Sequence, residues 1–152
     1  MEVTHLLARA VIRREDRVLL VRANGHAHTF LPGGHVEEGE GLTGCLRREL
    51  REELGVESRV GRYLGAVEHQ WTREGTSQYE VNHCFAVDVP ALGSSADPPA
   101  QEAYLSFEWA PVDALGDARL QPAPLRRLLA APEEATPWWA STLDSSVPVE
   151  GA

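Results

Sequence analysis

The chain contains no lysine: all fourteen basic residues are arginine, against 23 acidic residues, which gives a formal net charge of −9. A protein that grips nucleic acid without regard to sequence needs a basic surface, so this balance excludes that class. No hydrophobic run approaches the roughly 18 residues of a membrane-spanning helix. The first residues, MEVTHLLARA, lack the basic start and long apolar stretch of a signal peptide. We therefore expect a cytoplasmic protein that binds no membrane.

Cysteine is also scarce, since Cys45 and Cys84 are the only two. Their separation is unlike that of a metal-binding pair, and we expect both to be small packing residues rather than a disulfide. The 152 residues suffice for one domain with a buried core. We predict a single domain over residues 1–131 and a polar, partly mobile tail over 132–152.

The most informative feature of the chain is a row of acids. Glu49, Glu52 and Glu53 stand at the i, i+3, i+4 spacing that places three carboxylates on one helix face. Carboxylates this crowded repel one another unless a cation lies among them. All-oxygen ligation suits Mg2+ or Mn2+ better than zinc. The pattern therefore predicts a divalent metal site.

The residues before the acids complete a phosphate-handling segment. Gly33 and Gly34 follow a proline, so the backbone can turn there with positive φ and bring a carbonyl close to an ion. We predict a helix from Glu40 to Leu54 that ends at Gly55. Its buried stripe consists of leucines at every fourth position: Leu46, Leu50 and Leu54. The carboxylates should then lie at the edge of the core.

These 23 residues, Gly34 to Val56, resemble the signature of the Nudix hydrolases. The signature reads Gly, five residues, Glu, seven residues, Arg-Glu, aliphatic, any residue, Glu-Glu, any residue, Gly, aliphatic. The chain fills every specified position, with Gly34, Glu40, Arg48, Glu49, Leu50, Glu52, Glu53, Gly55 and Val56. Nine positions at fixed spacing make a specific motif. The resemblance implies an α/β fold, an α/β/α sandwich with a mixed sheet, and hydrolysis of a diphosphate linkage.

The resemblance also implies roles for the residues of the motif. Glu49, Glu52 and Glu53 would hold Mg2+ or Mn2+ together with the Gly33 carbonyl. One glutamate would also deprotonate the attacking water, with Glu52 and Glu53 the leading candidates. Arg48 would pair with Glu40 and clamp the loop onto the helix, while Gly34 and Gly55 would be structural.

A further glutamate outside the signature completes many sites of this family. Glu102 fits that place best, because it precedes the Glu108-Trp109 pair by six residues. Its alternative is an exposed loop acid, and Glu68 and Glu80 on the middle strands are competitors.

Substrate contacts are predicted around the glycine turn. Arg22, at the end of a strand beside it, is the candidate for a phosphate contact, with an ordinary surface arginine as the alternative. His35, with His28, would contact phosphate or line the loop. Phe30 and Trp71 are candidates for stacking on a base, although either could be core. The histidines lack the tight spacing of a zinc site.

The remaining pattern predicts strands over 6–14 and 17–23, joined at Glu15-Asp16, and over 56–71, 77–89 and 103–113. The Pro-rich segment 90–100 should be a loop. A short second helix is expected over 124–131, and Trp138 and Trp139 could anchor the tail.

The substrate is predicted by elimination. In the family, a proline about fifteen residues past the signature accompanies ADP-ribose hydrolysis, and a tyrosine slightly farther on accompanies dinucleoside polyphosphate hydrolysis. Trp71 and residues 72–74 (TRE) occupy those places here. A small-molecule nucleotide, either a nucleoside triphosphate or an oxidised or noncanonical one, is the leading expectation. Nucleotide sugars, dinucleoside polyphosphates and capped RNA remain alternatives, as does a noncatalytic nucleotide-binding module. Assembly as a homodimer is left open.

Overall fold

The structure, a computed structural model, describes residues 1–93 and 96–143. Its elements are β1 (Glu2–Val11), β2 (Arg13–Arg14), β3 (Arg17–Ala23), β4 (Gly33–His35), α1 (Leu42–Leu54), β5 (Arg59–Arg73), β6 (Thr76–Asp88), β7 (Leu105–Pro111), α2 (Pro124–Ala130), the 3-10 turn η1 (Glu133–Ala135) and β8 (Trp138–Ser141). The described helices include none that is long and apolar enough to cross a membrane.

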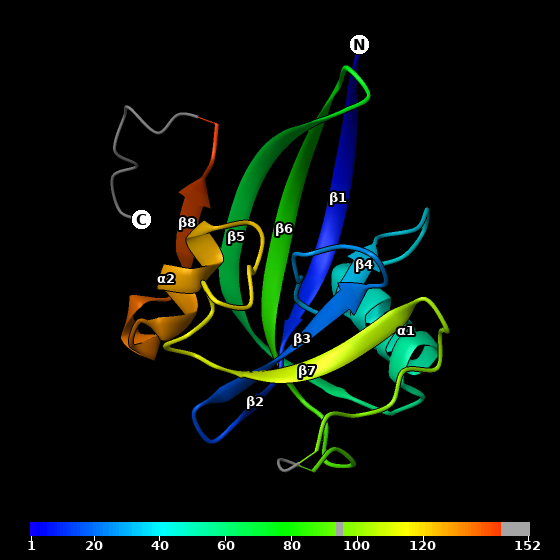
Figure 1. The fold of residues 1–152 in the computed structure, drawn as a ribbon, viewed down its shortest axis with the longest axis vertical. Helices are drawn as coiled ribbons and strands as arrows, with labels where there is room; N and C mark the ends of the chain where they lie inside the picture. Colours follow the sequence, from blue (N-terminus) through cyan, green and yellow to red (C-terminus); the bar gives the residue numbers. More distant parts are fainter. Residues whose placement is uncertain (94–95, 144–152) are drawn as a thin grey trace.

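Two sheets form the centre of the fold. The larger has the order β4-β1-β6-β5-β8 and is mixed, because β1 pairs with β6 in parallel and β5 pairs with β6 in antiparallel register. The smaller has the order β2-β3-β7. Figure 1 shows β3 and β7 crossing the lower halves of the long strands, with α1 and α2 at opposite sides. This arrangement confirms the α/β class and the mixed sheet.

Two apolar clusters fill the sandwich. One joins α1 to the sheets through Leu46 and Leu50, both fully buried, together with residues such as Ala8, Leu19 and Trp109. The other cluster joins α2, through Leu125 and Leu129, to the opposite faces of the two sheets. The leucine stripe predicted for α1 is confirmed. Because this stripe points into the core, the glutamates lie on a different face of the helix.

The predicted strand 6–14 is wrong in one respect, because it is two strands in different sheets. β1 pairs with β4 and β6, whereas β2 pairs with β3. The fully buried Ile12 lies between them, where the chain passes from one sheet to the other. The residues around Glu15, which has φ of 57°, form the predicted turn.

The predicted tail also needs correction. Residues 138–141 form β8, which extends the larger sheet in parallel beside β5. Trp138 is only 5% exposed and belongs to the core cluster of α2. The sheet therefore continues past residue 131, because the backbone of β5 offers an edge that this short segment completes. The rest of the tail, residues 144–152, lies outside the described residues.

Candidate active site

The signature helix begins two residues later than predicted, at Leu42. Gly41 is extended, with φ of −84° and ψ of 166°, and Glu40 lies before it in the loop. The helix ends as predicted at Gly55, which adopts the left-handed conformation with φ of 67°. Glu40 is held in the loop by its side chain, which accepts a hydrogen bond from the Glu37 N–H and two from Arg48.

Arg48 is the centre of the ion-pair network on this helix. Its Nε lies 2.7 Å from Glu40 Oε2, and its Nη1 lies 3.1 Å from Glu49 and 3.2 Å from Glu52. Its Nη2 also donates to the His35 carbonyl at 3.1 Å. The predicted pairing of Arg48 with Glu40 is present, and it ties the glycine turn to the helix. It also fixes the position of the Glu49 carboxylate.

The ion pair of Arg48 and Glu40 should be visible in the pH dependence of stability. The hydrogen bonds from Arg48 lower the pKa of Glu40 from 4.5 to about 2. The pair therefore stabilises the fold above pH about 4.5, and this contribution is lost as the pH falls toward 2. We expect Glu40→Gln to be less stable than the parent at pH 7, with the difference shrinking between pH 4.5 and 3.

Urea unfolding of both proteins at pH 7, 4.5 and 3 measures this difference. Glu38→Gln, which changes an exposed acid two residues away, is the matched control and should show no such pH-dependent gap. A gap for Glu40→Gln that stays constant across the whole range would contradict the assignment.

Glu53 differs from its neighbours because one of its carboxylate oxygens is fully buried. Its Oε2 has no hydrogen-bond partner among the described residues. Burial, followed by the adjacent Glu49 carboxylate, raises the pKa of Glu53 to about 8, while Arg9 acts in the opposite direction. A buried carboxylate pair with an unpartnered oxygen needs either a proton or a cation. These two glutamates therefore fit a hard divalent ion.

Gly33 and Gly34 have no side chains, and a Cβ atom at either position would clash with its surroundings. Gly33 has φ of 137°, and a Cβ there would lie 2.0 Å from the Ala8 carbonyl oxygen. A Cβ on Gly34 would lie 2.6 Å from the Glu49 carboxylate. Only glycine thus lets the β4 backbone approach β1 at Gly33 and the Glu49 carboxylate at Gly34. The role of the Gly33 carbonyl as a metal ligand stays a prediction.

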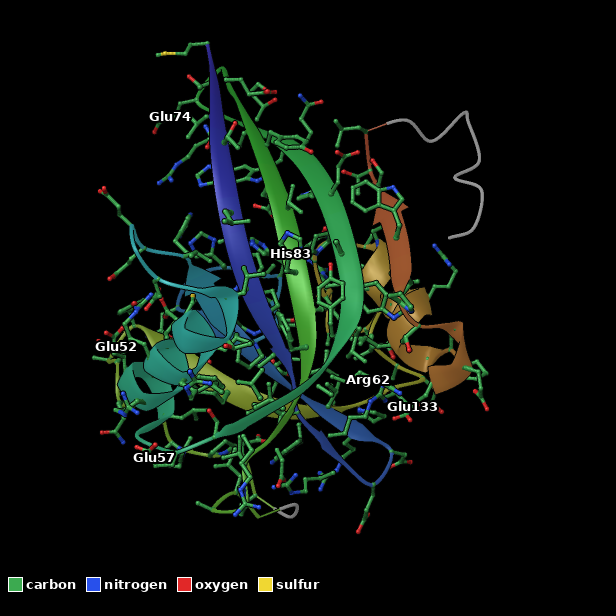
Figure 2. The ribbon with its side chains drawn as sticks, turned by 180° about the vertical axis from the view of Figure 1, so that it is seen from behind. Glu52, Glu57, Arg62, Glu74, His83 and Glu133 are labelled. Atoms are coloured by element: carbon green, nitrogen blue, oxygen red, sulfur yellow. The ribbon has the colours of Figure 1, made fainter. Side chains whose placement is uncertain are left out.

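The third glutamate is placed differently. The side chain of Glu52 is 53% exposed against 15% for Glu49, and Figure 2 shows it pointing outward from α1. Within residues 1–93 and 96–143, no three His, Cys, Asp or Glu side chains converge closely enough to hold an ion as they stand. The structure therefore brings Glu49 and Glu53 together and leaves Glu52 at the rim.

The loop that carries Glu102 packs against the end of the same helix. The Gln101 N–H donates to the Glu53 carbonyl at 2.7 Å. After burial, the nearby Glu102 and Glu53 carboxylates raise the pKa of Tyr104, so this tyrosine is close to both the loop acid and the helix acids. Its role as a ligand stays a prediction.

A cavity of about 660 Å³ lies on the β1-β6-β5 face of the larger sheet. Three predicted substrate contacts line it: Phe30, His35 and Trp71. His28 lines it as well. Arg22 does not, because its guanidinium pairs with Glu108 at 2.8 Å and donates to the Ala27 carbonyl. The prediction for Arg22 therefore needs correction, since Glu108 is 86 residues away and only the fold brings them together.

Sequence reasoning missed Arg9. This residue lines the cavity, donates to the Leu31 carbonyl at 3.0 Å and to Asn82 Oδ1 at 3.2 Å, and lies 5.7 Å from the centre of the Phe30 ring. Its positive charge also lowers the pKa of Glu53, against the larger effects of burial and Glu49. Arg9 is therefore the cation that joins the cavity to the helix acids. The sequence did contain a signal for Arg9: it alternates with His5 and Leu7 along a mostly apolar strand, so the three side chains share one face of β1.

His35 connects the two parts of the site through a hydrogen-bonded chain. His5 Nε2 lies 2.7 Å from Gln78 Oε1, which can only accept, and His5 Nδ1 lies 2.8 Å from His35 Nε2. Burial, then His5 and Arg9, lower the pKa of His35 and favour its neutral ring. With both rings neutral, His35 Nε2–H donates to His5, and its Nδ1 remains an acceptor. A phosphate contact through His35 would therefore need protonation.

His83 and the two cysteines are absent from the lining of the cavity. His83 lies on the opposite face of the sheet, as Figure 2 shows, with its Nδ1 2.9 Å from the Tyr63 hydroxyl. Cys45 and Cys84 are both free and buried, as expected.

Comparisons with known proteins agree with this geometry. The NUDIX domain profile matches residues 3–131. Rat diphosphoinositol polyphosphate phosphohydrolase 2 is 40% identical over 67 residues, a match that covers 43% of this chain and only 37% of the rat protein. Isopentenyl-diphosphate Delta-isomerase of Rhodobacter capsulatus is 30% identical over 143 residues, which covers 88% of this chain and 74% of the isomerase.

Solved structures show the same architecture. The E. coli ORF135 protein superposes with a TM-score of 0.60 at 29% identity, covering 89% of this chain and 94% of that one. A UDP-X diphosphatase superposes with a TM-score of 0.63 over 91% of this chain and 67% of that one; at 20% identity it shows the fold alone. The profile match includes the signature helix and all described strands except β8, so the chain belongs to the NUDIX domain family, as its motif predicted.

Proposed function

We propose that this protein is a hydrolase that depends on Mg2+ or Mn2+ and cleaves a phosphoanhydride bond in a nucleoside diphosphate linked to another moiety. A nucleoside triphosphate, including an oxidised or noncanonical one, is the leading substrate. The observation that carries the proposal is the buried Glu53 oxygen without a partner, which lies beside Glu49 next to a cavity with aromatic walls. The setting is the cytoplasm, where such nucleotides and Mg2+ are abundant.

The residues divide the chemistry between them. Glu49 and Glu53 would hold the divalent ion with the Gly33 carbonyl, and Glu52 and Glu102 would join from the rim. When bound, such an ion neutralises phosphate oxygens and makes water more acidic. A glutamate of the cluster takes the proton from the attacking water, with Glu52 and Glu53 the candidates.

Arg48 orients a carboxylate of the site, and Arg9 offers donors to the substrate. Arg48 holds Glu49 at 3.1 Å, so that this carboxylate keeps its orientation. Arg9 presents the remaining N–H donors of its guanidinium at the junction of cavity and helix, where the diphosphate of a substrate would lie. The bulk of the cavity then receives the rest of the nucleotide.

A Mg2+-dependent screen across nucleotide classes tests the proposal. Nucleoside triphosphates, nucleotide sugars, dinucleoside polyphosphates and capped RNA are each incubated with the protein, and mass analysis identifies whether phosphate, pyrophosphate or a mononucleotide is released. Turnover that needs Mg2+ or Mn2+ and disappears with EDTA supports the proposal. Nucleotide binding without turnover of any substrate would identify a noncatalytic module.

Two other substrates belong in the screen because of the comparisons. Diphosphoinositol polyphosphates are named for the rat relative, and isopentenyl diphosphate is named for the bacterial isomerase, whose match covers most of this chain. Both carry a diphosphate, so the same glutamates would serve them. Isomerisation leaves the diphosphate intact, and product analysis separates it from hydrolysis.

A further inference from the structure

The floor of the cavity holds a feature that phosphate chemistry does not require. β6 carries three polar side chains at alternate positions, and all are buried, with exposed fractions of 7% for Gln78, 9% for Glu80 and 1% for Asn82. Alternation along a strand places them on one face. Burial of polar groups is unfavourable unless hydrogen bonds compensate it. All three side chains have hydrogen-bond partners within the protein, so only the acceptor capacity that these bonds leave over is available to a ligand.

Glu80 is the member of this row that lines the cavity, and its carboxylate is fixed at both oxygens. Trp71 Nε1–H donates to Oε2 at 3.1 Å, and Asn82 Nδ2–H donates to Oε1 at 3.1 Å. Arg9 Nε–H donates to Asn82 Oδ1, which fixes the orientation of that amide. A carboxylate oxygen can accept two hydrogen bonds. Each Glu80 oxygen therefore has the capacity to accept one more hydrogen bond, and the two oxygens belong to one carboxylate.

The strand register places Glu80 at the far end of the site from the metal acids. Gly33 is paired with Arg9 on β1, whereas Glu80 is paired with His5, four residues away along the same strand. Four residues of strand span about 13 Å. His35 lies between the two ends, because it is paired with Leu7 on β1. A nucleotide whose phosphates lie at α1 would therefore bring its base to Glu80.

The walls at this end suit a flat ring rather than another phosphate. Trp71 and Phe30 line the cavity, and Trp71 is 37% exposed, so part of its indole is open to a ligand. A carboxylate at the floor repels phosphate groups, and the described part of the lining contains two arginines, Arg9 and Arg73. These features favour a nucleobase over a highly phosphorylated inositol ring.

We propose that Glu80 is a specificity-determining residue that selects a base with two adjacent N–H donors, which is the edge presented by the N1–H and 2-amino group of guanine. Two neighbouring acceptors match two neighbouring donors. Hypoxanthine lacks the 2-amino group and offers one donor, and adenine presents a ring acceptor at N1. This inference rests on the proposed function and specifies its substrate as a guanine nucleotide.

Kinetics with GTP, ITP and ATP in Mg2+ test the proposal. We expect kcat/KM for GTP to exceed that for ITP by at least about tenfold, because ITP leaves one acceptor unpaired, and that for ATP by more. Glu80→Gln replaces one acceptor with an N–H donor that opposes the 2-amino group. Its GTP to ITP ratio should fall to about one or below. Equal use of GTP and ITP by the parent protein, or an unchanged ratio in Glu80→Gln, would overturn the proposal.

Glu68→Gln is the matched control. Glu68 lies on the adjacent strand β5, accepts hydrogen bonds from Tyr79 and Ser141, and is absent from the cavity lining. It should leave the GTP to ITP ratio unchanged. Thermal unfolding of each variant checks the fold, and the comparison of GTP with ITP in the parent protein decides the proposal even if a variant does not fold.

Binding of GMP and IMP by calorimetry separates the two proposals. We expect GMP to bind the parent protein at least about tenfold more tightly than IMP. Nucleotide hydrolysis without a guanine preference would overturn the role of Glu80 and leave the hydrolase function standing. A preference for GMP without turnover of any nucleotide would overturn the hydrolase function and leave the base site standing.

Discussion

Replacement of Glu53 with Gln should lower turnover by at least about 100-fold in Mg2+ while the protein stays folded. The glutamine keeps the size of the side chain but cannot supply a carboxylate to a cation. Because burial and Glu49 raise the pKa of Glu53 to about 8, the metal-free protein already holds this group mostly neutral at pH 7. The free energy of unfolding in EDTA should therefore change little.

Steady-state kinetics on the substrate found in the screen measure the loss of turnover. Thermal unfolding with and without Mn2+ measures binding of the metal. A cation that binds only the folded state raises the melting temperature of the parent protein. Glu53→Gln should lose this rise. Glu57→Gln is the control, because Glu57 is an exposed acid just past the helix that pairs with Arg51 at 3.1 Å. Turnover of Glu53→Gln within threefold of the parent would remove Glu53 from the metal site.

The largest effect on stability should come from Gly33→Ala. The added Cβ would lie 2.0 Å from the Ala8 carbonyl oxygen, and the backbone has φ of 137°. The obstacle is backbone of β1, so no side chain can move aside. Strained φ alone costs about 1–3 kcal/mol. We expect the free energy of unfolding to fall by more than about 2 kcal/mol.

Urea unfolding measures this loss, and Gly116→Ala is its control because a Cβ there would meet no atom within 4 Å. Any Gly33→Ala protein that folds should also bind Mn2+ more weakly, since the predicted carbonyl ligand would be displaced with β4. A stability within about 0.5 kcal/mol of the parent would show that β1 and β4 can separate without cost, against the packing described above.

The local parts of the site could be predicted because their determinants are close in sequence. Helical periodicity fixed the buried stripe of Leu46, Leu50 and Leu54 and the shared face of the glutamates. The contact between Glu40 and Arg48 was implied by the resemblance to the Nudix signature, and the short separation of the two residues allows it. Gly33 has the positive φ expected after the proline. The predicted turn at Gly33 and Gly34 is wrong, because both residues belong to β4 and pair with β1.

The cavity could not be predicted because its walls come from distant strands. An alternating strand has two faces, and the sequence of β6 does not say which one meets the cavity. The pairing of β6 with β1 places Glu80 on the face that meets the cavity. The pairing of β7 with β3 brings Glu108 to Arg22, and the resulting ion pair keeps Arg22 out of the cavity lining. The short β8 had no local signal strong enough to predict a strand, because its stability comes from the edge of β5.

The sequence by itself therefore determined the family, the signature helix and the acids that it presents, since a repeat of three or four residues needs no tertiary contact to define a helix face. Tertiary structure decided how those acids differ. It buried a carboxylate oxygen of Glu53 beside Glu49, left Glu52 exposed, and linked Arg9 to Glu80 through Asn82 in the lining of one cavity, because burial and charge depend on which distant strands pack around each side chain.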